Sequence, residues 1–217
     1  MKFFRRAAGR PATVGVLAGT FNPPTRAHLA LARAALPLVD EVVFVLPCVF
    51  PHKNYEGAGF RERLRMLAAA LAGEPRFSIA STGSGMFLDI ARECRAAYGR
   101  TTALKFLCGR DAAERIEKWD CTRSDAFPEM LREFELLVFP RQGTYRPPPE
   151  SRDRILVLPL EGDFDEVSAT EVRNRIAKGQ AWEHLVPKPI VVLARESYGR
   201  QRSGQLPRPV SRKARRR

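Results

Sequence analysis

The stretch GTFNPPTRAH, residues 19–28, decides the fold of this chain because it joins two kinds of secondary structure. An apolar run at 14–18 precedes it and predicts a buried strand, and the Ala/Leu-rich segment 29–36 that follows predicts a helix. A helix N-terminus presents unpaired N–H groups and partial positive charge to anions. With Thr25 and His28 in the first helical turn, the stretch predicts a phosphate-binding turn.

Strand patterns and helix patterns alternate along the rest of the chain. Strands are expected at 14–18, 41–46, 77–81, 103–108, 135–139 and 155–158. Helices are expected at 26–36, 60–72, 86–98, 112–118, 168–178 and 189–197. This alternation predicts an α/β fold, a Rossmann-like, doubly wound parallel sheet with helices on both faces. The polar, proline-rich segment 141–154 predicts a surface loop.

Ligands of such sheets bind beyond the carboxyl ends of the strands. The segments at those ends are GTFNPPTRAH, PCVFPHK (47–53), CGRDAA (108–113), FPRQG (139–143) and VSATEVR (167–173). We expect them to meet in one crevice.

The net charge of +13 looks at first like that of a nucleic-acid-binding protein. From Arg195 onward, however, nine Lys/Arg residues stand against one glutamate, so +8 of the charge lies in the last 23 residues. The sequence therefore predicts one domain over residues 11–198 and a basic, disordered tail over 199–217. Nucleic acid is not expected as a partner, except through non-specific contacts of this tail.

The remaining composition favours a cytoplasmic protein that has no membrane segment and no zinc site. The basic segment 1–10 lacks the apolar core of a signal peptide, and no apolar run approaches the ~20 residues of a membrane span. The four cysteines show no CxxC spacing and no zinc pattern, so reduced thiols are expected. Whether the chain forms a homo-oligomer stays open.

Two helix starts carry the candidate chemistry. Thr25 and His28 are three residues apart and share a helix face. Ser168 and Glu171 fit a capping box, and Arg173 adds a planar fork of donors in the same first turn. Each feature also has a purely structural interpretation, as a capping group or a surface cation. No GxxxxGK[ST] loop and no GxGxxG turn occur, which argues against a P-loop or a nicotinamide dinucleotide fold.

GTFNPPTRAH resembles the (H/T)xGH signature of the nucleotidylyltransferase superfamily, and SATEVR (168–173) resembles its SxTxxR partner. Further blocks are similar to those of bacterial nicotinate mononucleotide adenylyltransferases. These blocks are Pro51–Lys53, Arg63–Leu67, Phe106–Trp119 and Val138–Arg141.

The resemblance implies that an adenylyl group passes from ATP to nicotinate mononucleotide, with release of pyrophosphate. Catalytic roles are implied for Thr25, His28, Lys53 and Arg173. By the same resemblance, the ATP site comprises Gly19, Thr20, Phe21, Asp111, Ser168 and Thr170. The acceptor site comprises Phe87, Trp119 and Arg141. Mg²⁺ is implied to arrive on the ATP phosphates, without a cage of protein carboxylates.

The chain departs from the family at three places. Thr25 and Ala27 replace a usual histidine and glycine, and Phe87-Leu-Asp-Ile-Ala91 stands where the family has YTxxT, a block that helps to recognise the nicotinate ring. Two alternatives therefore stay open: the same chemistry on another phosphorylated acceptor, and a non-catalytic nucleotide- or RNA-binding module. Trp119 could also simply complete the core, and Asp111 could simply cap a helix.

Overall fold

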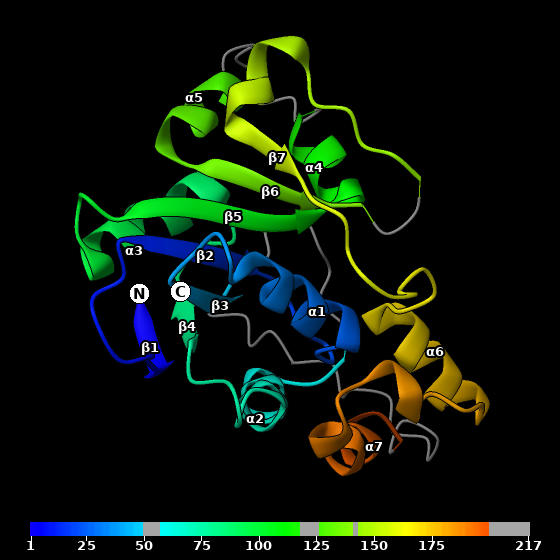
Figure 1. Cartoon of the computed structure of the whole chain (residues 1–217). Coiled ribbons are helices and arrows are strands. Elements are labelled where there is room, and N and C mark those ends of the chain that lie inside the picture. Colours follow the sequence, from blue (N-terminus) through cyan, green and yellow to red (C-terminus); the bar gives the residue numbers. More distant parts are fainter. Residues whose placement is uncertain (50–56, 118–125, 141–142, 200–217) are drawn as a thin grey trace, which may run out of the picture.

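The computed structural model describes residues 1–49, 57–117, 126–140 and 143–199. Its centre is a seven-stranded sheet with the order β1-β4-β3-β2-β5-β6-β7 (Figure 1). The strands are β1 (Lys2–Arg5), β2 (Thr13–Ala18), β3 (Glu41–Pro47), β4 (Phe77–Thr82), β5 (Ala103–Gly109), β6 (Glu135–Phe139) and β7 (Ile155–Val157). Neighbouring strands from β4 to β7 pair in parallel, and β1 pairs antiparallel with β4. The expected α/β class is confirmed.

Helices cover both faces of the sheet (Figure 1). One face carries α1 (Arg26–Ala35), α2 (Phe60–Ala70), α6 (Ala169–Lys178) and α7 (Val191–Gly199). The other carries α3 (Phe87–Tyr98), α4 (Arg110–Glu117) and α5 (Ala126–Glu133). Short 3₁₀ helices are η1 (Pro149–Arg154), η2 (Glu183–Leu185) and η3 (Lys188–Ile190). Among the described residues, no helix is long and apolar enough to cross a membrane.

The two-sided cover explains why the central strands read as continuous apolar runs. All seven residues of β3 are buried. Val42 and Phe44 face the cluster under α1 and α2, whereas Val43 and Val45 face the cluster under α3 and α5. A strand that alternates between two covered faces favours apolar residues at nearly every position, and the exception in β3 is Glu41, whose carboxylate accepts from the Tyr98 hydroxyl.

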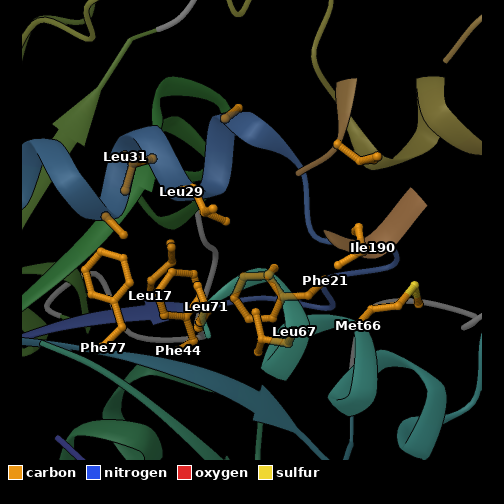
Figure 2. Packing of buried hydrophobic residues seen from close by; sticks show 14 of the residues in the cluster. Leu17, Phe21, Leu29, Leu31, Phe44, Met66, Leu67, Leu71, Phe77 and Ile190 are labelled. Atoms are coloured by element: carbon orange, nitrogen blue, oxygen red, sulfur yellow. The ribbon is translucent and has the colours of Figure 1, made fainter. Parts of the chain in front are cut away.

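The core under α1 and α2 extends to the carboxyl edge of the sheet. Figure 2 shows the rings of Phe77, Phe44 and Phe21 in one cluster with Leu17 and Leu71. The centroids of Phe44 and Phe77 are 5.4 Å apart, and those of Phe21 and Phe44 are 5.5 Å apart. Phe21 therefore anchors the turn after β2 in the hydrophobic core.

The structure contains elements that the sequence patterns did not indicate. The sheet begins at Lys2, ahead of the expected domain start at residue 11, because Phe3 packs on Tyr98 and Arg5 donates to the carbonyls of Leu71 and Glu74. Helix α5 was also not expected.

The expected surface loop at 141–154 is confirmed over residues 143–148, which form no helix or strand and are mostly exposed or half-buried, whereas Pro149–Arg154 forms a 3₁₀ helix. Tyr145 and Ser151 are buried, and the segment ends in η1. Burial together with the nearby Glu117 carboxylate raises the pKa of the Tyr145 hydroxyl above its ordinary value.

Candidate active site

The candidate site lies where the chain connections change direction along the sheet. The chain leaves β2 through α1 toward β3 and leaves β5 through α4 toward β6, on the other side. The carboxyl ends of β2 and β5 therefore flank the topological switch point, where doubly wound sheets bind their ligands. GTFNPPTRAH follows β2 at this point, and Asp111 lies in the first turn of α4 after β5.

The turn after β2 has an unusual backbone. Phe21 adopts φ +45°, and the Asn22–Pro23 peptide bond is cis. Phe21 is 1% exposed, and its ring meets the His28 imidazole edge-on, with 5.2 Å between their centroids. A Cβ at Gly19 would lie 3.3 Å from the Phe21 ring, so glycine permits this close approach. The Phe21 side chain belongs to the core, so any contact of residue 21 with a nucleotide falls to its backbone.

Thr25 and His28 contact each other at the start of α1. The Thr25 backbone N–H donates to His28 Nδ1 at 2.9 Å, and Thr25 Oγ1 lies 2.7 Å from the same nitrogen. Because Nδ1 accepts a backbone proton, a neutral imidazole carries its own proton on Nε2. The geometry therefore makes His28 a donor through Nε2, which suits an anion at the helix start.

The second helix start begins with Ser168, whose Oγ accepts a 3.0 Å bond from the Glu171 backbone N–H. Ser168 is thus the N-cap of α6, as the capping-box pattern predicts. One turn later, Arg173 Nη2 lies 3.3 Å from Thr170 Oγ1. Arg173 Nη1 donates to the backbone oxygen of Asn22 at 2.6 Å. The two expected motifs therefore meet in space, although they lie far apart in the sequence.

Asn22 connects this turn to two further segments. Its side-chain Oδ1 accepts from the Ala58 N–H at 3.1 Å and from the Tyr198 hydroxyl at 2.6 Å. On the other side of Phe21, Arg63 Nη1 donates to the Thr20 carbonyl at 2.9 Å. The turn is thus held by side chains from α2, α6 and α7.

Two other described residues of the expected site, Asp111 and Phe87, follow the carboxyl ends of β5 and β4. The Asp111 side chain is 73% exposed and its carboxylate is 3.6 Å from Arg110. Phe87 begins α3 at the carboxyl end of β4, with its ring 4.8 Å from that of Phe106. Leu88 packs against the same core cluster, and Ala91 is buried in it. Lys53, Trp119 and Arg141 lie outside the described residues.

Sequence reasoning assigned no site role to Asn22, Arg63 or Tyr198, although Asn22 lies in GTFNPPTRAH and Arg63 begins the family block Arg63–Leu67. A second signal marks Arg63, because it interrupts the apolar face of α2 and is only 4% exposed. The contacts of Asn22 and Tyr198 join residues 176 positions apart, so no local pattern reports them.

Residues 16–175 match the family model described as cytidylyltransferase-like. A protein of Exiguobacterium sibiricum named "Probable nicotinate-nucleotide adenylyltransferase" is 31% identical over 192 residues, which cover 84% of this chain and 96% of that protein. A protein of the same name from Gloeobacter violaceus is 30% identical, covering 82% and 91%. Among solved structures, the Plasmodium falciparum nicotinic acid mononucleotide adenylyltransferase complexed with NaAD gives a TM-score of 0.63 at 15% identity, covering 83% and 95%. This structural likeness supports the fold.

Proposed function

Because the chain belongs to the cytidylyltransferase-like family, and to the nicotinate-nucleotide adenylyltransferases within it, we infer that it transfers the adenylyl group of ATP to nicotinate mononucleotide in NAD biosynthesis. An oxygen of the mononucleotide phosphate forms a bond to the α-phosphorus of ATP. The bond from that phosphorus to the bridging oxygen breaks, and pyrophosphate leaves with the electron pair. Because the attacking phosphate is already anionic, positioning and charge stabilisation carry the reaction.

The observation that carries this function is the 2.6 Å bond between Arg173 and the Asn22 carbonyl. It places the arginine of the second helix start against the turn that leads to His28. A cation and a histidine donor brought to one phosphate-binding turn suit a polyphosphate substrate.

His28 and Thr25 act on the ATP phosphates. The Nδ1 contacts orient the imidazole, so Nε2–H donates to a phosphate oxygen. Thr25 is 1% exposed, and its hydroxyl lies beside the ring. His28 serves as a hydrogen-bond donor here, and the reaction needs no general base.

Arg173 stabilises the charge that develops on the departing pyrophosphate. Its planar guanidinium carries five donors and can bind phosphate oxygens while it keeps its contacts with Asn22 and Thr170. Lys53, Ser168 and Thr170 contribute to the same charge stabilisation. The backbone of residues 19–21 lines the nucleotide, and Asp111 binds the ribose hydroxyls of ATP.

On the acceptor side, Trp119 stacks on the pyridine ring, Phe87 lies beside it, and Arg141 binds a substrate phosphate. These three assignments rest on the family blocks at Phe106–Trp119 and Val138–Arg141 and on the place of Phe87 at the end of β4.

Mg²⁺ enters as part of MgATP, held by the phosphate oxygens of the substrate. Within the described part of the chain, no three His, Cys, Asp or Glu side chains gather as a metal-binding group. Carriage by the nucleotide follows the general behaviour of Mg²⁺, which commonly keeps several waters and binds through substrate phosphates.

One observation favours a second candidate, the same transfer to another acceptor. Leu88 and Ala91 occupy the positions of the two family threonines, and both pack against the core. The first turn of α3 therefore offers an acceptor no threonine hydroxyl at these positions. A related phosphorylated acceptor that has no carboxylate would lose little binding affinity without these two hydroxyls.

A pyrophosphate-release screen tests the function. Purified protein is incubated with ATP or CTP and with nicotinate mononucleotide, nicotinamide mononucleotide or phosphorylated alcohols. We expect the highest kcat/KM with ATP and nicotinate mononucleotide. Higher kcat/KM with another acceptor would select the second candidate. Absence of release from every pair would mean that the chain is a non-catalytic binding module.

A further inference from the structure

We propose that Tyr198 is a positioning residue for adenylyl transfer: its hydroxyl holds the Asn22 side chain, and so fixes the carbonyl that anchors Arg173. The inference rests on the proposed function, since it concerns the same site. Tyr198 lies near the end of α7, outside both sequence motifs.

The contact between Tyr198 and Asn22 is buried and specific. Each residue is 3% exposed, and the hydroxyl donates to Oδ1 at 2.6 Å. The Ala58 N–H donates to the same oxygen at 3.1 Å. A buried amide oxygen that accepts from two donors has a defined orientation. Turning away from either donor would cost a hydrogen bond in a low-dielectric environment.

The orientation of the Asn22 side chain is transmitted to its backbone. Asn22 lies between two constrained residues. The Phe21 ring is packed in the core, and the Pro23 ring fixes the φ angle of Pro23. The amide is joined to the backbone by a single methylene, so its position constrains the Asn22 carbonyl. That carbonyl accepts the 2.6 Å bond from Arg173. Tyr198 therefore acts on the guanidinium through one intervening residue.

The surrounding helices give Tyr198 a rigid base. Helix α7 contacts both α2 and α6, and Tyr198 belongs to the same buried cluster as Met66 and Ile190. Figure 2 shows Met66 and Ile190 at the end of this cluster where Phe21 lies. A hydroxyl presented from packed helices holds its partner with little freedom, which is the property that precise positioning needs.

Tyr98 offers a matched control. Its hydroxyl also donates to a buried side chain, the Glu41 carboxylate, but this contact lies at the amino end of β3, the opposite edge of the sheet. Tyr98→Phe and Tyr198→Phe each delete one hydroxyl that donates to a buried side chain. Any general effect of lost stability appears in both variants.

The first measurement is the steady-state kinetics of the two variants at a temperature well below both unfolding transitions. We expect Tyr198→Phe to lower kcat about 10-fold, less than the ~10²-fold that a misplacement of about 1 Å can cost. The KM for ATP should change by less than about twofold, because Arg173 acts on charge that develops in the transition state. Tyr98→Phe should keep the wild-type kcat. A wild-type kcat in Tyr198→Phe overturns the inference.

A double-mutant cycle with Arg173→Ala tests the proposed route. If Tyr198 acts through Arg173, Tyr198→Phe has no further effect on kcat in the Arg173→Ala background. The same fold loss in both backgrounds overturns the inference. Absence of turnover in the wild type would instead refute the proposed function, so the two failures are distinguishable.

Hydrogen exchange supplies a readout that needs no turnover. We expect amide exchange in the segment 19–25 to be faster in Tyr198→Phe than in Tyr98→Phe and the wild type. Unchanged exchange there overturns the inference, whatever the kinetics show.

Discussion

The guanidinium of Arg173 donates to the backbone carbonyl of Asn22 at 2.6 Å, which joins two residues 151 positions apart. Through this contact the start of α6 meets the turn that leads into α1. Neither helix start is a nucleotide site by itself, since a capped N-terminus is a common structural feature. Together they bring a histidine, a threonine and an arginine to the carboxyl end of β2.

His28→Ala should lower kcat/KM by about 10²–10³-fold, because it removes a preorganised donor to the ATP phosphates. The fold should survive, at a cost of about 1 kcal/mol for the lost contact with the Thr25 N–H. Steady-state pyrophosphate release and thermal unfolding measure the two effects. His184→Ala is the matched control, since His184 contacts Arg175 between α6 and η2. Near wild-type turnover in His28→Ala would remove His28 from the mechanism.

Arg173→Lys should lower kcat by about 10²-fold while the protein stays folded, because an ammonium cannot reproduce the planar fork that bridges Asn22, Thr170 and phosphate. Arg175→Lys, two residues along the same helix, should keep its turnover. Arg175 pairs with Glu166 and Glu171 instead. Equal kinetics in the two variants would show that the position of the cation on α6 is irrelevant.

Arg63→Ala should weaken ATP binding and lower the free energy of unfolding by about 1.5–3 kcal/mol, the range for a hydrogen bond to a charged group. The reason is the lost contact between its guanidinium and the Thr20 carbonyl, which supports the turn next to Phe21. Calorimetric titration with ATP and urea unfolding check the two effects. Arg61→Ala removes an exposed arginine from the same helix and should change neither. An unaltered ATP affinity in Arg63→Ala would contradict the expected support.

Stability should fall as the pH rises above about 9. Burial raises the pKa of the Cys94 and Cys108 thiols from 9.0 to about 12, with the neighbouring Glu93 carboxylate adding to the shift at Cys94. Between these values the unfolded chain loses protons that the folded chain keeps, so each thiol costs up to about 1.4 kcal/mol per pH unit. Urea unfolding at pH 8 and pH 10 measures the decline. A Cys94→Ala/Cys108→Ala variant should show a shallower slope, and an identical slope would contradict the burial of the thiols.

Much of the fold could be predicted from the sequence because its signals are local. The apolar run of β3, the Ser168–Glu171 cap and the Gly19 turn each report a nearby structure, and all three have the expected form. Strand β1 gave no such signal. Its phenylalanines lie among basic residues, and the strand gains stability from distant segments, namely β4, the Tyr98 ring and carbonyls of the 71–74 turn.

The site was predictable only in part, because only its local features leave a signal in the sequence. His28 and Arg173 lie at helix starts, which sequence patterns mark well. Asn22 and Tyr198 matter through hydrogen bonds between distant segments, and a local sequence pattern does not report such a contact. Ala91, by contrast, departs from the family pattern visibly in the sequence, because it stands where the family has a threonine. The structure adds that this position is buried in the core.

The most direct test of the account is ³¹P NMR of the purified protein with MgATP and nicotinate mononucleotide. We predict the signals of a dinucleotide and of free pyrophosphate in equal amounts, because the bond between the α- and β-phosphates of ATP breaks as the new one forms. Formation of ADP, release of AMP without a dinucleotide, or unchanged ATP would contradict adenylyl transfer as the function of this site.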